Sequence, residues 1–217
     1  MSAIKHLWMY YRTFLPKYRV VIETPVVASV WFTAEFYHMT EELFRDAIYF
    51  KEQAENLSDD PNNNPKRRRY SRVSIILSFS TIECFINEFI IKSLSDPSNP
   101  NITPSVKRFL ENKRPSIGEK ITLGVELITG KQVDSSNSAY NGFNRLIKWR
   151  NSLVHIEENK NMQRVNATLP KNKKNEDIAT VYNAKKGIET VRAIIKEIHK
   201  LEDTDYPEFI DTIQLNK

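Results

Sequence analysis

The stretch from Tyr70 to Leu94 constrains the fold most strongly, because its apolar residues recur with the period of an α-helix. This wide apolar face consists of Ile75, Phe79, Ile82, Phe85, Ile86, Phe89 and Ile90. Such a face has to be buried against other elements. The chain has only 5 Gly in 217 residues, too few for a nucleotide-binding α/β scaffold or a strand-rich sandwich. The sequence therefore predicts an all-α protein, built as a helical bundle.

The remaining apolar periodicity predicts helices on both sides of this stretch. They cover residues 4–15, Val26 to about Asn56, Ser105–Asn112, Ser116–Thr129, Tyr140–Glu158 and Val181–Leu201. Thr24-Pro25 is typical of an N-cap followed by Pro at the first helical position. Ser116 and Glu119 have capping-box spacing, and Gly130 is placed to end that helix as a C-cap.

Two polar segments divide the chain. Leu57 to Pro65 has the composition of a linker, with two prolines and three asparagines. We therefore expect an N-terminal helical extension with its linker over residues 1–65, a helical bundle over 66–205 and a C-terminal tail over 206–217. Lys160 to Asp177 is a long basic excursion within the bundle, in which Arg164–Leu169 could form a short hairpin.

The charge is distributed unevenly along the chain. Residues 1–65 carry 6 Lys/Arg against 9 Asp/Glu, whereas residues 66–217 carry 26 against 18. A basic second part suits a polyanionic partner such as RNA. The basic side chains that we consider candidates for RNA binding are Lys66, Arg67, Arg68, Arg69, Lys148, Lys171, Lys173 and Lys174. The run at 66–69 is either a solvated helix start or a phosphate-contacting surface.

Cys84 is the single cysteine, which excludes an internal disulfide and a Cys-rich zinc site within the chain. Its apolar neighbours favour a small buried hydrophobe over a nucleophile. The segment from Met1 to His6 lacks the apolar core of a signal peptide, and Val20 to Phe36 is too charged to span a bilayer. The four histidines are scattered, and we expect neither a metal nor a cofactor. The predicted setting is cytoplasmic, without a membrane.

One charged side chain falls where the predicted helix Tyr140–Glu158 should be apolar. The apolar stripe of this helix contains Phe143, Leu146, Ile147, Leu153 and Val154. Arg150 lies in the middle of that stripe, and burying an unpaired guanidinium is very costly. Glu83 falls within the apolar arc of its own helix and is the best candidate partner. Ser80 and Asn87 share the side of Glu83. A purely structural ion pair between Arg150 and Glu83 is one interpretation.

A catalytic interpretation uses the residues that follow Arg150. Asn151 and His155 are four residues apart and face the same way on a helix. Histidine is suited to proton transfer near neutral pH, and the arginine fork matches two phosphate oxygens. An imidazole could take the proton from a ribose 2′-OH, which attacks the adjacent phosphorus, while the guanidinium stabilises the phosphoryl charge. Such a cleavage of RNA requires no metal.

The pattern Arg150-Asn151-x-x-x-His155, in the penultimate long helix, resembles the motif of the HEPN superfamily. The upstream helix, with Ser80, Glu83 and Asn87 in an apolar background, is similar to the first core helix of that family. The resemblance covers about residues 68–203. It implies an all-α, up-and-down bundle that pairs with a second copy of itself and cleaves RNA at a shared cleft.

The resemblance also implies roles for particular residues. Arg150 and His155 would be the catalytic pair, Asn151 a polar positioning residue and Glu83 a supporting partner. Many active members are toxins or act in defence against phage, often beside a nucleotidyltransferase-like antitoxin. Some carry a Tyr two residues after the His, which the partner modifies, but this chain has Glu157 there.

Two questions stay open at this point. Some HEPN domains have no nuclease activity, so the alternative function is a non-catalytic helical module that binds RNA or a partner protein. In addition, Arg150 and His155 are separated by about 140° around an ideal helix. Either the long arginine side chain reaches round the helix, or the motifs of two protomers complete each other.

Overall fold

The computed structural model describes residues 25–112, 115–154 and 178–213, in which all regular elements are helical. In chain order they are α2 (Pro25–Glu55), α3 (Asn64–Ser95), α4 (Pro104–Asn112), α5 (Ile117–Glu119), η1 (Lys120–Gly124), α6 (Val125–Thr129), α7 (Ser138–Val154), α9 (Val181–Glu202) and α10 (Phe209–Thr212). The predicted fold class, an all-α helical bundle, is confirmed for this part of the chain.

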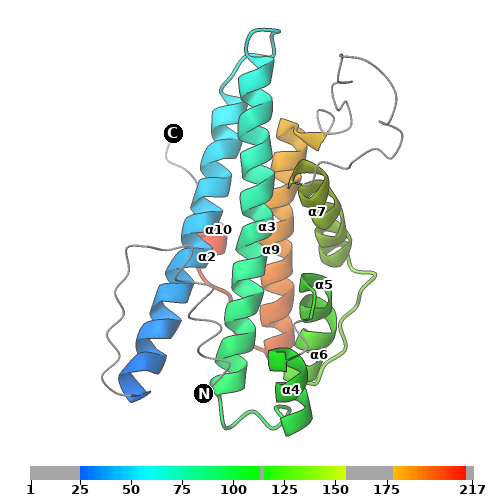
Figure 1. Cartoon of the computed structure of the whole chain (residues 1–217). Coiled ribbons are helices and arrows are strands. Elements are labelled where there is room, and N and C mark those ends of the chain that lie inside the picture. The colour runs from blue at the N-terminus through cyan, green and yellow to red at the C-terminus, as the bar shows by residue number, and fades with distance from the viewer. Residues whose placement is uncertain (1–24, 113–114, 155–177, 214–217) are drawn as a thin grey trace, which may run out of the picture.

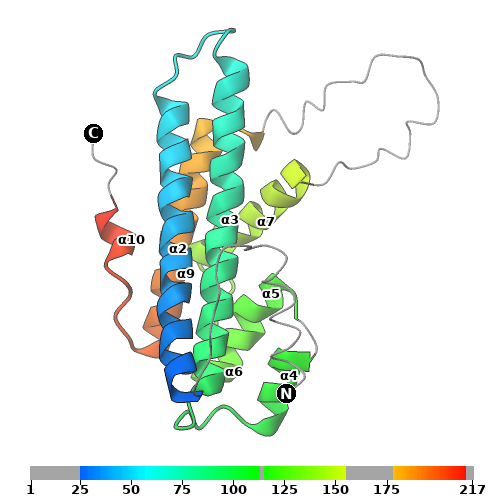
Figure 2. The ribbon, with the colours of Figure 1, turned by 60° about the vertical axis from the view of Figure 1, so that its left-hand side comes forward.

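Three long helices, α2, α3 and α9, lie side by side and form the body of the bundle (Figure 1). The chain ascends through α2, turns at the top, descends through α3, ascends again through α7 and descends through α9. The short helices α4, α5 and α6 cover the lower part of the side on which α7 lies. Figure 2 shows that α7 diverges from α3 toward its own C-terminal end.

Most predicted helix boundaries agree with the structure within a few residues. Helix α2 begins at Pro25, and the Ser116 capping box is present, with the Glu119 amide donating to Ser116 Oγ over 3.3 Å. Gly130 has a φ of 68° and ends α6. Helix α3 is longer than predicted, because it begins at Asn64. The predicted helix at residues 4–15 and the hairpin at Arg164–Leu169 lie outside the described residues.

The core is continuous from α2 to α9, with α3 at its centre. The largest side chains with no measurable exposure include Phe44, Ile75, Ile82, Ile86, Leu146, Ile194, Ile195 and Ile198. Helix α2 contributes Phe44, Ala47 and Ile48 to this core, and Ser74 of α3 donates a 2.7 Å hydrogen bond to the Ala47 carbonyl. Over its described part, the N-terminal extension predicted for residues 1–65 thus shares one core with the bundle.

The C-terminal segment, predicted as a tail over residues 206–217, packs on the bundle as far as it is described. Ile210 of α10 is completely buried and Ile213 is 5% exposed. Arg192 of α9 donates a 2.9 Å hydrogen bond from Nε to the Ile210 carbonyl, and its guanidinium lies 5.6 Å from the centroid of the Phe44 ring. The hydrogen bond joins α10 to α9, and the Phe209 ring of α10 lies 6.2 Å from the Phe44 ring of α2.

Two glycines allow α9 to lie close to α7 and to α3. A Cβ added to Gly142 of α7 would lie 2.8 Å from Thr190 Oγ1 of α9, and one added to Gly187 of α9 would lie 3.1 Å from Ser78 Oγ of α3. The first of these distances is shorter than side chains tolerate. The absence of a side chain at Gly142 therefore sets how closely α7 approaches the bundle.

By length and composition, α3 could cross a membrane, since its most apolar window has a mean hydropathy of 1.6. However, 61% of that window is buried inside the protein. The same composition is typical of the central helix of a bundle, and the contacts of α3 with α2, α7 and α9 agree with that role.

Candidate functional site

A cleft of about 490 Å³ opens between α3, α7 and the segment that leads into η1. The side chains that line it and that matter for its chemistry are Phe79 and Glu83 from α3, Lys120 from η1, and Ile147, Arg150 and Asn151 from α7. The cleft is lined by residues of both α3 and α7, the two helices that diverge toward the C-terminal end of α7 in Figure 2. It unites residues from three segments that are far apart in the sequence.

The guanidinium of Arg150 lies against aromatic side chains. Its guanidinium carbon is 5.2 Å from the centroid of the Phe79 ring, and Phe79 in turn stacks on Phe143 with ring centroids 6.5 Å apart and planes within 5°. Cation–π contacts of this kind contribute about 0.5–2 kcal/mol. Nη1 of Arg150 also donates a 3.2 Å hydrogen bond to Oδ1 of Asn151. These contacts hold the half-buried guanidinium at the wall of the cleft.

The expected ion pair between Arg150 and Glu83 does not form. No nitrogen of Arg150 lies within 4.0 Å of a carboxylate oxygen of Glu83, although both residues line the cleft. The prediction that Glu83 occupies a core position is also wrong, because its side chain is exposed. Helix α3 packs against α2 and α9, whereas Glu83 lines the cleft together with residues of α7. The Glu83 carboxylate therefore does not serve as the buried partner of Arg150.

Lys120 is a cleft residue that the sequence did not single out. Its Nζ donates a 2.6 Å hydrogen bond to Oδ1 of Asn87, one helical turn from Glu83. Burial lowers the pKa of the Lys120 ammonium, and the negative charge of Glu83 acts in the opposite direction. Lys120 lies between Ile117 and Ile121 in the sequence, on the apolar side of a short helix. A charge on an apolar stripe, the signal that identified Arg150, could have identified it too.

The predicted site residues are brought together only in part. Arg150, Asn151 and Glu83 line one cleft, and Asn87 reaches it through Lys120. Ser80 is half-buried on α3 and does not line the cleft. His155 lies outside the described residues, as do Glu157, Lys171, Lys173 and Lys174.

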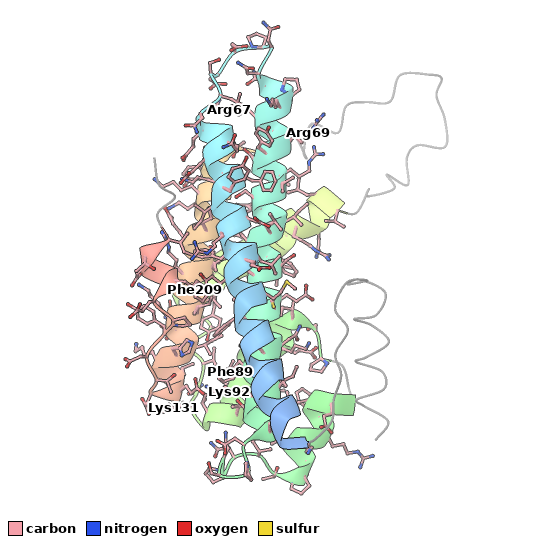
Figure 3. The ribbon with its side chains drawn as sticks, turned by 90° about the vertical axis from the view of Figure 1, so that its left-hand side faces the viewer. Arg67, Arg69, Phe89, Lys92, Lys131 and Phe209 are labelled. Carbon is pink, nitrogen blue, oxygen red and sulfur yellow. The ribbon has the colours of Figure 1, made fainter. Side chains whose placement is uncertain are left out.

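The basic run at 66–69 occupies the first turns of α3, at the hairpin end of the bundle. Figure 3 shows Arg67 and Arg69 at that end, with Phe89 and Lys92 near the opposite end of the helix. Arg67 binds Asp59 at 2.6 Å and donates to the Ala54 carbonyl, so this side chain holds the hairpin together. Lys66 lies over the Tyr70 ring at 5.7 Å.

The other predicted RNA-binding residues of the described part are exposed. They are Arg68, Arg69 and Lys148. Lys148 lies on α7 outside the cleft. Arg67 is half-buried and engaged within the fold.

Comparisons of the chain with protein-family models, with curated proteins and with solved structures found no match. Among the described residues, no group of three or more His, Cys, Asp or Glu side chains is placed to hold a metal ion. The functional assignment of this helical bundle therefore depends on the residues of the cleft and on the sequence motif that contributes two of them.

Proposed function

We propose that this chain is a metal-independent endoribonuclease of the HEPN type, acting as a toxin or a defence protein. The observation that carries the proposal is that Arg150 and Asn151, which begin the motif, line one cleft together with Glu83 of α3. If the motif had arisen by chance, its residues would not be expected to line a cleft together with a carboxylate from a distant helix. The exposed basic side chains outside the cleft, Arg68, Arg69 and Lys148, add positive charge that suits an RNA substrate.

Each residue has a defined role in the proposed reaction. The imidazole of His155 takes the proton from the ribose 2′-OH as the 2′-oxygen bonds to phosphorus, and the bond from phosphorus to the 5′-oxygen breaks. The leaving 5′-oxygen takes a proton from solvent, and the imidazolium returns its own proton to solvent, so that the products are a cyclic phosphate and a free 5′-hydroxyl. The guanidinium of Arg150 stabilises the charge on the non-bridging oxygens. Its fixed position over Phe79 means that little reorganisation accompanies the reaction.

Asn151 orients the arginine in this scheme. Its Oδ1 accepts a hydrogen bond from Nη1 of Arg150, which restrains the orientation of the guanidinium that would meet the phosphate. Glu83 is the supporting acidic residue in this scheme. Its exposed carboxylate lies in the same cleft, where it can accept a hydrogen bond from a ribose hydroxyl.

The proposal is tested by incubating the purified full chain with a mixed RNA pool in EDTA. Arg150→Ala and His155→Ala are compared with Arg145→Ala, a matched control on the exposed side of α7 that does not line the cleft. Removing a catalytic group of this kind lowers the rate by about 10²–10⁴-fold. We expect that loss in the first two variants and near-normal cleavage in the control.

Two outcomes would contradict the proposed ribonuclease activity. If the wild-type chain leaves the RNA intact, the alternative function applies, in which the chain is a non-catalytic module that binds RNA or a protein through the same cleft. Equal cleavage by all four proteins would assign the activity to a contaminant.

A further inference from the structure

Lys120 occupies an unusual environment for a lysine. It is half-buried, it lines the cleft with Arg150, and it begins the π-helical turn η1, in which the Val125 amide bonds to the Lys120 carbonyl. Single π-helical turns inside α-helices occur frequently at functional sites. The residues that follow, Ile121 and Val125, are completely buried and fix this segment to the core.

The contacts of the Lys120 ammonium do not balance its charge. Its hydrogen-bond partner in the described part of the chain is the neutral amide of Asn87, and no carboxylate of that part lies within 4.0 Å. Taking an ammonium partly out of water disfavours its charged form, and the more distant Glu83 offsets this only in part. A lysine placed only for packing would be expected to reach water or an acidic partner.

The Asn87 contact does, however, order the side chain. An ammonium has three N–H donors, and Asn87 accepts one of them at 2.6 Å. The remaining donors are available to an occupant of the cleft. Because the rotamer is already restrained, less conformational entropy is lost when that occupant binds.

We propose that Lys120 is a second phosphate-binding residue of the cleft, which holds the backbone of the RNA while Arg150 acts on the scissile phosphate. This inference rests on the proposed function. Lys120 and Arg150 come from different elements, so a strand lying in the cleft contacts both η1 and α7. Lys120 acts as a point charge on the bound substrate, and it therefore contributes to binding rather than to the chemical step.

The test uses the full chain and a fluorescein-labelled RNA oligonucleotide whose riboses are 2′-O-methylated, so that it binds but cannot be cleaved. Affinity is measured by fluorescence anisotropy over a range of salt concentrations for Lys120→Met and for Lys107→Met. Lys107 is an exposed lysine of α4 outside the cleft and serves as the matched control. We expect the Lys120 variant to bind about tenfold more weakly, with a salt slope lower by about 0.7, and the control to be unchanged.

A merely structural lysine would behave differently. Removing a half-buried charge that the fold needs would lower the melting temperature, whereas a binding residue leaves it unchanged or higher. On cleavable RNA, Lys120→Met should raise KM and leave kcat close to the wild-type value. Unchanged affinity and salt slope, or a loss of affinity that only follows a loss of folded protein, would overturn the role of Lys120.

The uncleavable probe separates this inference from the enzymatic proposal. If the wild-type chain binds the probe through Lys120 but leaves natural RNA intact, the nuclease fails and the binding role stands. If natural RNA is cleaved and Lys120→Met binds normally, the binding role fails and the nuclease stands. A wild-type chain that does not bind the probe overturns the role of Lys120 as well.

Discussion

Glu83 and Glu88 lie on different sides of α3, and their surroundings differ in access to water, which controls the charge of a carboxyl group. Glu83 is exposed in the cleft, whereas Glu88 is only 5% exposed and lies between α3 and α2. Oε2 of Glu88 accepts a 3.4 Å hydrogen bond from Thr40 of α2, and its Oε1 has no partner. Burial raises the pKa of Glu88 to about 7, against the lowering effects of Thr40 and Lys92.

This pKa predicts a pH-dependent stability. The folded chain holds the Glu88 proton between about pH 4.5 and 7, where the unfolded chain releases it, so the free energy of unfolding falls as the pH rises through that window. Glu88→Gln should remove this pH-dependent loss of unfolding free energy, which amounts to roughly 3 kcal/mol at most. Urea unfolding at pH 5 and pH 8 measures it, with exposed Glu42→Gln as the control. Parallel pH profiles for wild type and Glu88→Gln would contradict the assignment.

The position of helix α7 decides whether Arg150 faces the cleft. Gly142, two turns before Arg150, allows α7 to contact Thr190 of α9 directly. Thr190 is nearly buried, and its hydroxyl is held by a 2.8 Å hydrogen bond to the Lys186 carbonyl, so it cannot easily turn away. A side chain at Gly142 would therefore displace the helix and the guanidinium that it carries.

Gly142→Ala should destabilise the protein by about 1–3 kcal/mol, despite the higher helix propensity of alanine, because the new methyl group overlaps Thr190. Shortening the opposing side chain in the double variant Gly142→Ala/Thr190→Ala should recover most of that loss. Thermal or urea unfolding of the two single variants and the double variant gives the interaction energy. Strictly additive effects would show that the two residues do not meet.

Apolar periodicity was sufficient to predict the long helices, because each buries one continuous face. It did not reveal which neighbour covers each face, and for that reason Glu83 was placed in the core although its side chain is exposed in the cleft. Lys120 was missed because η1 is a single irregular turn within a short helical segment. The packing of Ile210 was missed because α10 has only 4 residues, too few to show a period.

In the whole molecule, the motif begins with Arg150 and Asn151 in the cleft and continues beyond the last described residue of α7, Val154, to His155. On an ideal helix, the five-residue spacing between Arg150 and His155 corresponds to about 140°, which would make it difficult for one protomer to aim both side chains at the same phosphate. A pair of protomers related by a two-fold axis resolves this, because each supplies one member of each catalytic pair. We therefore expect a homodimer in solution.

Mixing two inactive variants tests that arrangement directly. If each site combines Arg150 of one protomer with His155 of the other, a dimer of one Arg150→Ala and one His155→Ala chain contains one complete site and one that lacks both groups. Random exchange makes half of the dimers mixed, so the mixture should recover about a quarter of wild-type activity, whereas each variant alone stays inactive. If both groups act from the same protomer, no mixed dimer has a complete site. Mixtures that form dimers by light scattering yet regain no cleavage would thus refute a shared site.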